Sequence, residues 1–157
     1  MLGWRTWLLV IGALSATTFT ACQPEAKSDA TVVRVIDGDT LDVRIGLAQE
    51  RIRLISVDSP EARNPTECFG PEASRRTAEL VPPGTRVGLE RDVTEHDRFG
   101  RLLRYVYLPD GRLLSAVLIA EGFAEVVFYP PDRRFLSVLR AAEQSAQADG
   151  LGLWGAC

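Results

Sequence analysis

Residues 51–61 read RIRLISVDSPE, and this stretch indicates more about the fold than any other. Apolar and polar residues alternate through its first half, so that Ile52 and Leu54 fall on one face, as in a half-buried strand. The Ser59-Pro60 pair predicts the end of the strand, because proline cannot donate a backbone hydrogen bond to a sheet. The segment therefore predicts a strand that carries an arginine and is followed at once by two acids.

Strand patterns flank this segment on both sides. On its N-terminal side, branched and polar residues alternate around Asp37-Gly38, a dipeptide typical of hairpin turns. On its C-terminal side, Pro109-Asp110-Gly111 closes the last apolar run of this kind. We expect strands at residues 31–36, 40–45, 51–57, 85–90 and 102–108.

Helical patterns follow the third strand and fill the last third of the chain. We expect helices at residues 71–80, 113–121 and 133–148, the first with Pro71 at a first-turn position. In the last of them, the apolar residues recur at helical spacing, which assigns that stripe to the core. This order of elements predicts a single α+β domain, a five-stranded Greek-key β-barrel of the OB type with about three α-helices.

The N-terminus is typical of an export signal. Residues 1–21 contain one basic residue before an apolar run that is too short to span a bilayer as a finished helix. The following Phe19-Thr20-Ala21-Cys22 resembles a bacterial lipobox, in which leucine is more usual at the place of Phe19. We therefore expect Cys22 to be lipidated. Cleavage by an ordinary signal peptidase and a buried N-terminal helix remain as alternatives.

We expect the remainder of the chain to form one domain behind a tether. Residues 22–30 are polar with no hydrophobic period, and residues 31–157 suffice for a single modest core. The chain has 18 Lys and Arg against 21 Asp and Glu, a formal net charge of −3. A protein that coats nucleic acid would be basic, so any binding of phosphate must come from a few local cations.

Three cysteines occur in the chain. If Cys22 carries lipid, Cys68 and Cys157 are left as a pair in an oxidising compartment. Their disulfide would close a loop of about 90 residues and remove about 4–5 kcal/mol of unfolded-state entropy. Two cysteines and the single His96 lack the spacing of a zinc site, and two unpaired thiols are the remaining alternative.

Acids and arginines gather in three short motifs of the expected barrel. Carboxylates are the ligands that hard cations prefer, and guanidinium groups bind phosphate with two parallel hydrogen bonds. Such a combination is typical of a metal-assisted phosphodiesterase. The side chains concerned are Asp39, Arg53, Asp58, Glu61 and Arg101.

Each of these residues also has a simpler interpretation. Arg53 could form a surface pair with a neighbouring acid, which would stabilise the fold little. Glu61 could be the first-turn acid of a short helix, and Arg101 a solvated residue after a turn. His96 stands between two acids in an expected turn, where we interpret it as a solvated loop residue rather than a catalytic one.

Five motifs in order resemble the staphylococcal nuclease (thermonuclease) family, and together they extend over residues 31–154. One isolated motif of this kind is weak, because Asp-Gly-Asp-Thr alone is more often a plain hairpin. Their joint order and spacing carry the resemblance. The motifs are Val35–Thr40, Arg53–Glu61, Phe69–Ser74, Asp97–Arg101 and Gly150–Trp154.

The resemblance implies a Ca²⁺-dependent endonuclease that acts on DNA and RNA. Asp39 and Asp58 match the calcium carboxylates of the family, and Ser59 matches a residue that contributes its backbone carbonyl. Glu61 matches the residue assigned as the general base or water-orienting group. Arg53 and Arg101 match the arginines that bind phosphate, so the attacking group is expected to be a metal-bound or Glu61-oriented water.

Aromatic residues depart from the family pattern at two places. Phe99 stands where family members have a tyrosine in the Asp-x-Tyr-Gly-Arg turn, which removes a hydroxyl near the phosphate. An aromatic residue that stacks on the base falls at Phe128 or Tyr129, and stacking requires only an aromatic face. These changes should reduce substrate affinity more than they reduce the rate of the chemical step.

Three hypotheses follow from the sequence. The first is an exported, monomeric nuclease that a lipid on Cys22 anchors to a membrane of the bacterial cell envelope, on its periplasmic or surface face. The second is a non-catalytic barrel that binds nucleic acid or protein, and the third is a structural envelope lipoprotein. The retained acids and arginines favour the nuclease, with 3′-phosphate product ends implied by the resemblance.

Overall fold

The computed structural model describes residues 27–63 and 65–157. The expected signal peptide, the lipidation site at Cys22 and most of the tether lie outside the described residues. In chain order, the elements are β1 Ser28–Val35, β2 Thr40–Ile45, β3 Ala48–Leu54, β4 Val57–Asp58, α1 Gly70–Leu80, β5 Arg86–Glu90, β6 Leu102–Tyr107, α2 Leu114–Ala120, β7 Glu125–Val126, α3 Leu136–Ala148 and α4 Leu153–Ala156.

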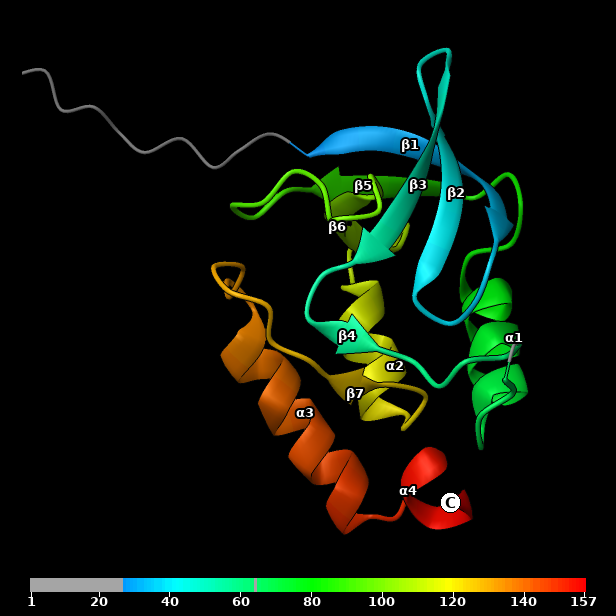
Figure 1. The fold of residues 1–157 in the computed structure, drawn as a ribbon, viewed down its shortest axis with the longest axis vertical. Coiled ribbons are helices and arrows are strands. Elements are labelled where there is room, and N and C mark those ends of the chain that lie inside the picture. Colours follow the sequence, from blue (N-terminus) through cyan, green and yellow to red (C-terminus); the bar gives the residue numbers. More distant parts are fainter. Residues whose placement is uncertain (1–26, 64) are drawn as a thin grey trace, which may run out of the picture.

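Five strands close into a barrel in the order β1-β2-β3-β6-β5, with β5 paired back to β1. All of these pairings are antiparallel except β3 with β6, which run parallel. Figure 1 shows the barrel at one end of the molecule and the helices toward the other, with the short β4 and β7 pair among the helices, beside α3. The predicted five-stranded barrel of the α+β class with OB-type topology is confirmed.

The strand expected at residues 51–57 is broken in two, which corrects the prediction. The backbone of Ser56 has φ 59°, a left-handed conformation that few non-glycine residues adopt and that cannot continue a strand. β3 therefore ends at Leu54, and Val57–Asp58 pairs separately with β7. The break turns the chain out of the barrel just before the acids that follow it.

The N-terminal boundary of the domain also differs from the prediction. Residues 28–30 were expected in the polar tether, but they form the start of β1 and pair in turn with Leu89, Gly88 and Val87 of β5. Their main-chain hydrogen bonds need no apolar side chains, so no hydrophobic pattern marks them. Ala30 is buried at 4% exposure, and the tether therefore ends before Ser28.

The helices begin and end close to the predicted positions, with one exception. The expected helix at residues 133–148 begins only at Leu136, after a turn in which the Leu136 amide donates to the Arg133 carbonyl. Asp132, which could have capped an earlier start, accepts from the amides of Val93 and Thr94 instead. No helix in the described part of the chain combines the length and hydropathy needed to cross a membrane.

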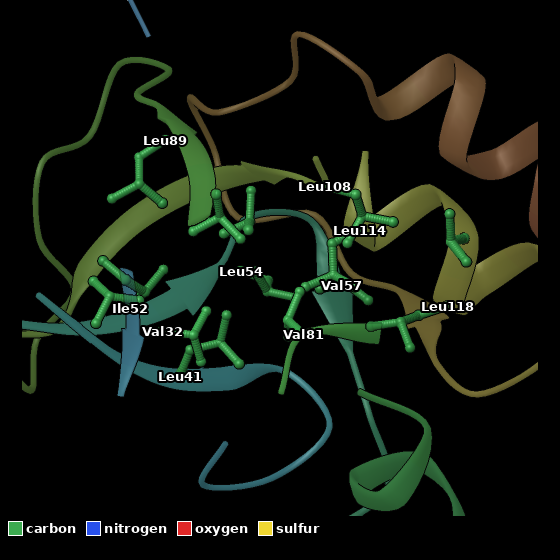
Figure 2. Packing of buried hydrophobic residues seen from close by; sticks show 14 of the residues in the cluster. Val32, Leu41, Ile52, Leu54, Val57, Val81, Leu89, Leu108, Leu114 and Leu118 are labelled. Carbon is green, nitrogen blue, oxygen red and sulfur yellow. The ribbon is translucent and has the colours of Figure 1, made fainter. Parts of the chain in front are cut away.

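One apolar core joins the barrel to α2. Figure 2 shows Leu54, Val57 and Val81 between the barrel residues and the leucines of α2, Leu114 and Leu118. All five are at most 2% exposed, and full burial of such a side chain contributes about 1.5–3 kcal/mol. The barrel and the helices therefore form one folding unit, and its rim holds the polar residues described below.

Cys68 and Cys157 form a disulfide, with their Cα atoms 6.0 Å apart and 89 residues apart in sequence. The bond joins the loop before α1 to the last residue of the chain, beyond α4. The predicted pairing of these two cysteines is thus present in the structure.

Candidate active site

Asp39 is the buried centre of the acidic site. It follows the turn between β1 and β2, and its backbone carbonyl accepts from the Leu54 amide of β3 at 3.0 Å. Its carboxylate accepts from the Ser59 amide at 3.0 Å and from the Thr40 hydroxyl at 2.9 Å. Asp39 is only 5% exposed, so these donors fix its orientation and link the first turn to the segment after β4.

Gly38 permits this close approach of two chain segments. A Cβ atom at position 38 would lie 2.5 Å from the Ser59 hydroxyl oxygen and 2.6 Å from the Ser59 Cβ. The Gly38 carbonyl accepts from the Thr77 hydroxyl of α1 at 2.8 Å. The Asp37-Gly38 pair thus does more than form the predicted hairpin turn, because it packs Ser59 against Asp39.

Arg53 connects the two acids that were predicted to bind metal. Its Nη2 lies 3.1 Å from Asp39 Oδ2 and 2.6 Å from Asp58 Oδ1. Its Nη1 donates to the carbonyls of Val57 at 2.5 Å and Leu54 at 3.2 Å. Only 12% of the Arg53 side chain is exposed, so the simple interpretation of a surface pair is wrong.

The carboxylates of this site repel one another. Burial, together with the charge of the adjacent Asp39, raises the pKa of Asp37 to about 6. The pKa of Asp58 is raised mainly by burial, against the opposing effect of Arg53. Burial and the charges of Asp39, Glu67 and Asp58 raise the pKa of Glu61 in turn. The single guanidinium therefore leaves the site with an excess of negative potential.

Glu61 lies beyond Ser59 on an exposed stretch and is not part of a helix. Its pKa responds to Asp39, Asp58 and Arg53, which places its carboxylate within their electrostatic reach. Its amide donates to the Glu67 carboxylate at 2.9 Å. The interpretation of Glu61 as a first-turn helix acid is therefore wrong.

Arg101 is held in a tight turn by Asp97. The Arg101 Nε lies 2.6 Å from Asp97 Oδ2, and the amides of Arg101 and Phe99 both donate to Asp97 Oδ1 at 2.9 Å. Partial burial would raise the pKa of Asp97, but these hydrogen bonds outweigh it and lower the pKa below its ordinary value. The Arg101 side chain is 27% exposed, and its terminal nitrogens donate no hydrogen bond within the described part of the chain, so they can face a ligand.

A cavity of about 500 Å³ lies between the two arginines. Buried apolar residues of the break between β3 and β4 form part of its wall, and Arg53, Arg101, Phe99 and Tyr129 also line it. Phe99 is 68% exposed and Tyr129 is 66% exposed, so both rings are available for stacking. Phe128 is absent from the lining of this cavity, which leaves Tyr129 as the better placed of the two candidates. His96 also lines the cavity, and it is exposed.

The donor set of the acidic site fits a hard cation that keeps much of its water. Asp39 and Asp58 contact the same nitrogen of Arg53 and so lie side by side, next to the backbone of Ser59. Among residues 27–63 and 65–157, no three His, Cys, Asp or Glu side chains are arranged to hold a metal together. Two carboxylates, a carbonyl and several waters match the oxygen-rich, flexible shell of Ca²⁺ better than the closed set of a zinc site.

Three residues near the site carry no sequence signal that would identify them. Glu67 contacts Glu61, Glu125 lies opposite Asp58 in the pairing of β4 with β7, and Asp132 joins the loop of Tyr129 to the loop of Thr94. Glu67 and Asp132 lie in irregular segments, and Glu125 lies in a strand of only two residues, so no periodic pattern marks any of them. Only their acidity distinguishes them in the sequence, and many surface residues share that property.

Comparison with known proteins agrees with this site. Residues 51–156 match the family model described as "Staphylococcal nuclease homologue". The chain is 38% identical over 131 residues to endonuclease YncB of Bacillus subtilis (strain 168), covering 80% of this chain and 61% of that protein. It is 38% identical over 126 residues to the thermonuclease of Staphylococcus intermedius, covering 78% and 74% of the two chains. It is 34% identical over 163 residues to the micrococcal nuclease of Shigella flexneri, covering 96% and 88%.

The chain thus spans less than two thirds of the length of YncB and most of the length of the other two relatives. The family match itself begins within β3, at residue 51, and includes the break after it, the Asp97 turn and the helices α1 to α4. This chain belongs to the staphylococcal nuclease family.

Proposed function

We propose that this protein is a Ca²⁺-dependent endonuclease that hydrolyses phosphodiester bonds of DNA and/or RNA by attack of water. One observation carries the proposal: the buried Arg53 guanidinium joins Asp39 and Asp58 at the edge of a cavity that Arg101 and two exposed aromatic rings also line. The names of the relatives, all nucleases, support the same reaction class.

The arginines supply the contacts that a phosphodiester needs. Attack of water places additional negative charge on the equatorial oxygens of the phosphate. Arg53 and Arg101 both face the cavity, and Asp97 fixes Arg101 through its Nε while other guanidinium nitrogens remain available. Donors that are held in place before the reaction stabilise that charge without reorganisation, at about 2.7–4 kcal/mol for each donor.

Glu61 is suited to orient the water and accept its proton. A general base works best when its pKa approaches the working pH. Burial raises the pKa of Glu61 above its ordinary value, and the neighbouring acids raise it in the same direction. The carboxylate remains exposed, so that a water molecule can reach it from solvent.

Asp39, Asp58 and the carbonyl of Ser59 would hold the cation. When bound, Ca²⁺ would neutralise charge on the phosphate and on the surrounding acids. Gly38 and the Ser59 amide keep these oxygens in place by the contacts described above. Asp58 is 58% exposed in its side chain, which leaves room for ligand waters.

The cavity explains why the substrate is expected to be a nucleic acid. Tyr129 and Phe99 present exposed rings on which a base can stack, and stacking contributes about 1–3 kcal/mol for each base without strong sequence preference. The acidic net charge of −3 means that binding depends on these local contacts rather than on a general electrostatic attraction. Such binding favours release of the cleaved product.

The N-terminal pattern extends the proposal to the place of action. We infer that the chain is exported and that a lipid on Cys22 anchors the domain to a bacterial membrane, with the domain working as a monomer. The disulfide between Cys68 and Cys157 supports an oxidising compartment, since cytosolic thiols are ordinarily kept reduced. A Cys22→Ser variant should lose lipid label and leave the detergent phase, while its cleavage rate in solution stays unchanged.

A digestion assay tests the reaction itself. Purified protein is incubated with single- and double-stranded DNA and RNA in Ca²⁺, Mg²⁺ or EDTA, and the product ends are analysed. We expect cleavage in Ca²⁺ with 3′-phosphate ends and none in EDTA. Binding without cleavage would instead support the non-catalytic module, and neither binding nor cleavage would support a structural role.

A further inference from the structure

The backbone of Glu61 is held on both sides by a single residue. The Glu61 amide donates to Glu67 Oε2 at 2.9 Å, and the Glu67 amide donates to the Glu61 carbonyl at 2.8 Å. An exposed loop residue ordinarily gives these two backbone groups to water. Here both are bound within the protein, so the peptide that carries the Glu61 side chain has a defined position.

The start of α1 holds Glu61 on a third side. The Gly70 amide donates to the Glu67 carbonyl at 3.1 Å. A Cβ atom on Gly70 would lie 2.1 Å from the Glu61 carbonyl oxygen and 2.5 Å from its carbonyl carbon. Because these are backbone atoms, they could not avoid the clash by a side-chain rotation. Glycine is therefore required at this place to let the helix approach Glu61.

A covalent bond supports the residue that makes these contacts. Glu67 is followed directly by Cys68, which is bonded to Cys157 beyond α4. This bond ties the backbone next to Glu67 to a region 89 residues further along the chain. The contacts to Glu61 are therefore made from a segment that the rest of the fold holds in place.

We propose that Glu67 is a positioning residue for Glu61, fixing the peptide from which the Glu61 carboxylate reaches the attacking water. The proposal rests on the function proposed for Glu61. Its action is geometric: Glu67 offers Glu61 one side-chain acceptor and one backbone donor, and this role requires no contact with the substrate. Misplacement of a reacting group by about 1 Å can cost 10²-fold in rate, so loss of this support should lower the rate constant more than substrate binding.

Two substitutions separate geometry from charge. Glu67→Gln removes the charge but keeps an oxygen that can accept from the Glu61 amide, whereas Glu67→Ala removes both. Glu72→Ala is the matched control, because Glu72 is an acid in the first turn of α1, shortly after Glu67, and within residues 27–63 and 65–157 its carboxylate pairs only with Arg75. Gly70→Ala is a second route, since it should displace Glu61 while leaving the Glu67 side chain unchanged.

The first measurement is hydrogen exchange of the Glu61 amide by NMR in the metal-free protein, which does not depend on activity. We expect a protected amide in the wild type, in Glu67→Gln and in Glu72→Ala, and exchange at least about 10-fold faster in Glu67→Ala. The second measurement is steady-state cleavage. We expect kcat to fall about 10- to 100-fold in Glu67→Ala and Gly70→Ala with KM nearly unchanged, and to stay within about 3-fold of wild type in Glu67→Gln.

The outcomes are distinct. An unprotected Glu61 amide in the wild type overturns the inference, and so does wild-type kcat in Glu67→Ala. A Glu67→Gln variant as slow as Glu67→Ala, with its amide still protected, would show that charge rather than position matters and would also overturn it. If Glu67→Ala does not fold, the kcat of Gly70→Ala decides the question, and a wild-type kcat in that variant overturns the inference. A wild-type protein that does not cleave removes the proposed function, and this inference with it.

Discussion

Replacement of Arg53 should affect both the stability of the protein and its rate of cleavage, and lysine separates the two effects. Arg53 contacts Asp39, Asp58 and two backbone carbonyls at once, with 12% of its side chain exposed. A lysine ammonium has the charge but only three donors on one nitrogen, so it cannot replace the contacts that the two terminal nitrogens of Arg53 make with four acceptors. Arg53→Lys should therefore keep part of the stability and little of the catalysis.

The expected magnitudes follow from the burial of each partner. Breaking a fully buried ion pair costs about 3–5 kcal/mol, but the Asp58 side chain is 58% exposed and can be solvated. We therefore expect Arg53→Ala to lower the free energy of unfolding by about 2–3 kcal/mol, mostly because Asp39 loses its cation. Loss of one prepositioned donor to the phosphate should lower kcat by about 10²–10³-fold in both variants.

Denaturant unfolding without divalent cations gives the stability, and single-turnover cleavage gives the rate constant. Calcium titration by calorimetry is the control, since Arg53 is not a cation ligand and both variants should still bind. A lysine variant with the wild-type rate constant would refute the role of the planar guanidinium. Unchanged stability of Arg53→Ala would refute the buried pairing with Asp39.

Other substitutions test further parts of the structure. Cys157→Ser should lower the free energy of unfolding by about 2–4 kcal/mol, because the disulfide closes a long loop; thermal unfolding with and without reductant measures this, and equal melting temperatures would contradict it. The hydrogen bonds from Arg51 and Arg34 lower the pKa of Asp42 in the folded protein. The ionised carboxylate therefore stabilises the fold fully above its unfolded pKa of about 4, and this contribution is lost as the pH falls through the folded pKa. Asp42→Asn should therefore cost about 1–3 kcal/mol at pH 7 in urea unfolding, with the difference from wild type shrinking in more acidic solution; a difference independent of pH would argue against the ion pairs. Phe99→Tyr adds a hydroxyl at the cavity and should lower KM several-fold with little change in kcat. Steady-state cleavage kinetics measure both constants, and a change in kcat alone would contradict the prediction.

Much of the fold follows from local patterns in the sequence. The alternating residues around Ile52 and Leu54 predict a strand with a buried face, and both side chains are at most 2% exposed. The stripe around Leu139 predicts a helix packed on the core, and Leu139 is fully buried. These patterns are reliable because burial of one face imposes a period of two on strands and of 3.6 on helices.

The places where prediction failed depend on contacts between distant segments. Ser56 adopts a left-handed conformation that no local pattern indicates, and so the strand appeared continuous through Val57. The start of β1 at Ser28 is fixed by pairing with β5, far along the chain, rather than by apolar side chains. The late start of α3 has a similar cause, since Asp132 binds the amides of Val93 and Thr94.

The candidate site, like the fold, was predicted in part. The motif residues and the family resemblance predicted that Asp39, Arg53 and Asp58 would act together, and the structure places these side chains in contact. The roles assigned to them remain predictions. Glu67 and Gly70 were missed as parts of the site, because their importance comes from hydrogen bonds and close packing against the Glu61 backbone.

The most direct test of the proposed reaction is cleavage of a fluorescent DNA duplex by the wild type and by Asp58→Ala across a range of Ca²⁺ concentrations. Asp58→Ala removes an exposed carboxylate of the acidic site, and unfolding in the same buffer verifies that it folds. We predict that the wild type cleaves in Ca²⁺ and stops in EDTA, and that Asp58→Ala requires far more Ca²⁺ or does not cleave. Equal cleavage by both proteins at limiting Ca²⁺, or full wild-type activity in EDTA, would contradict the proposed metal-assisted mechanism.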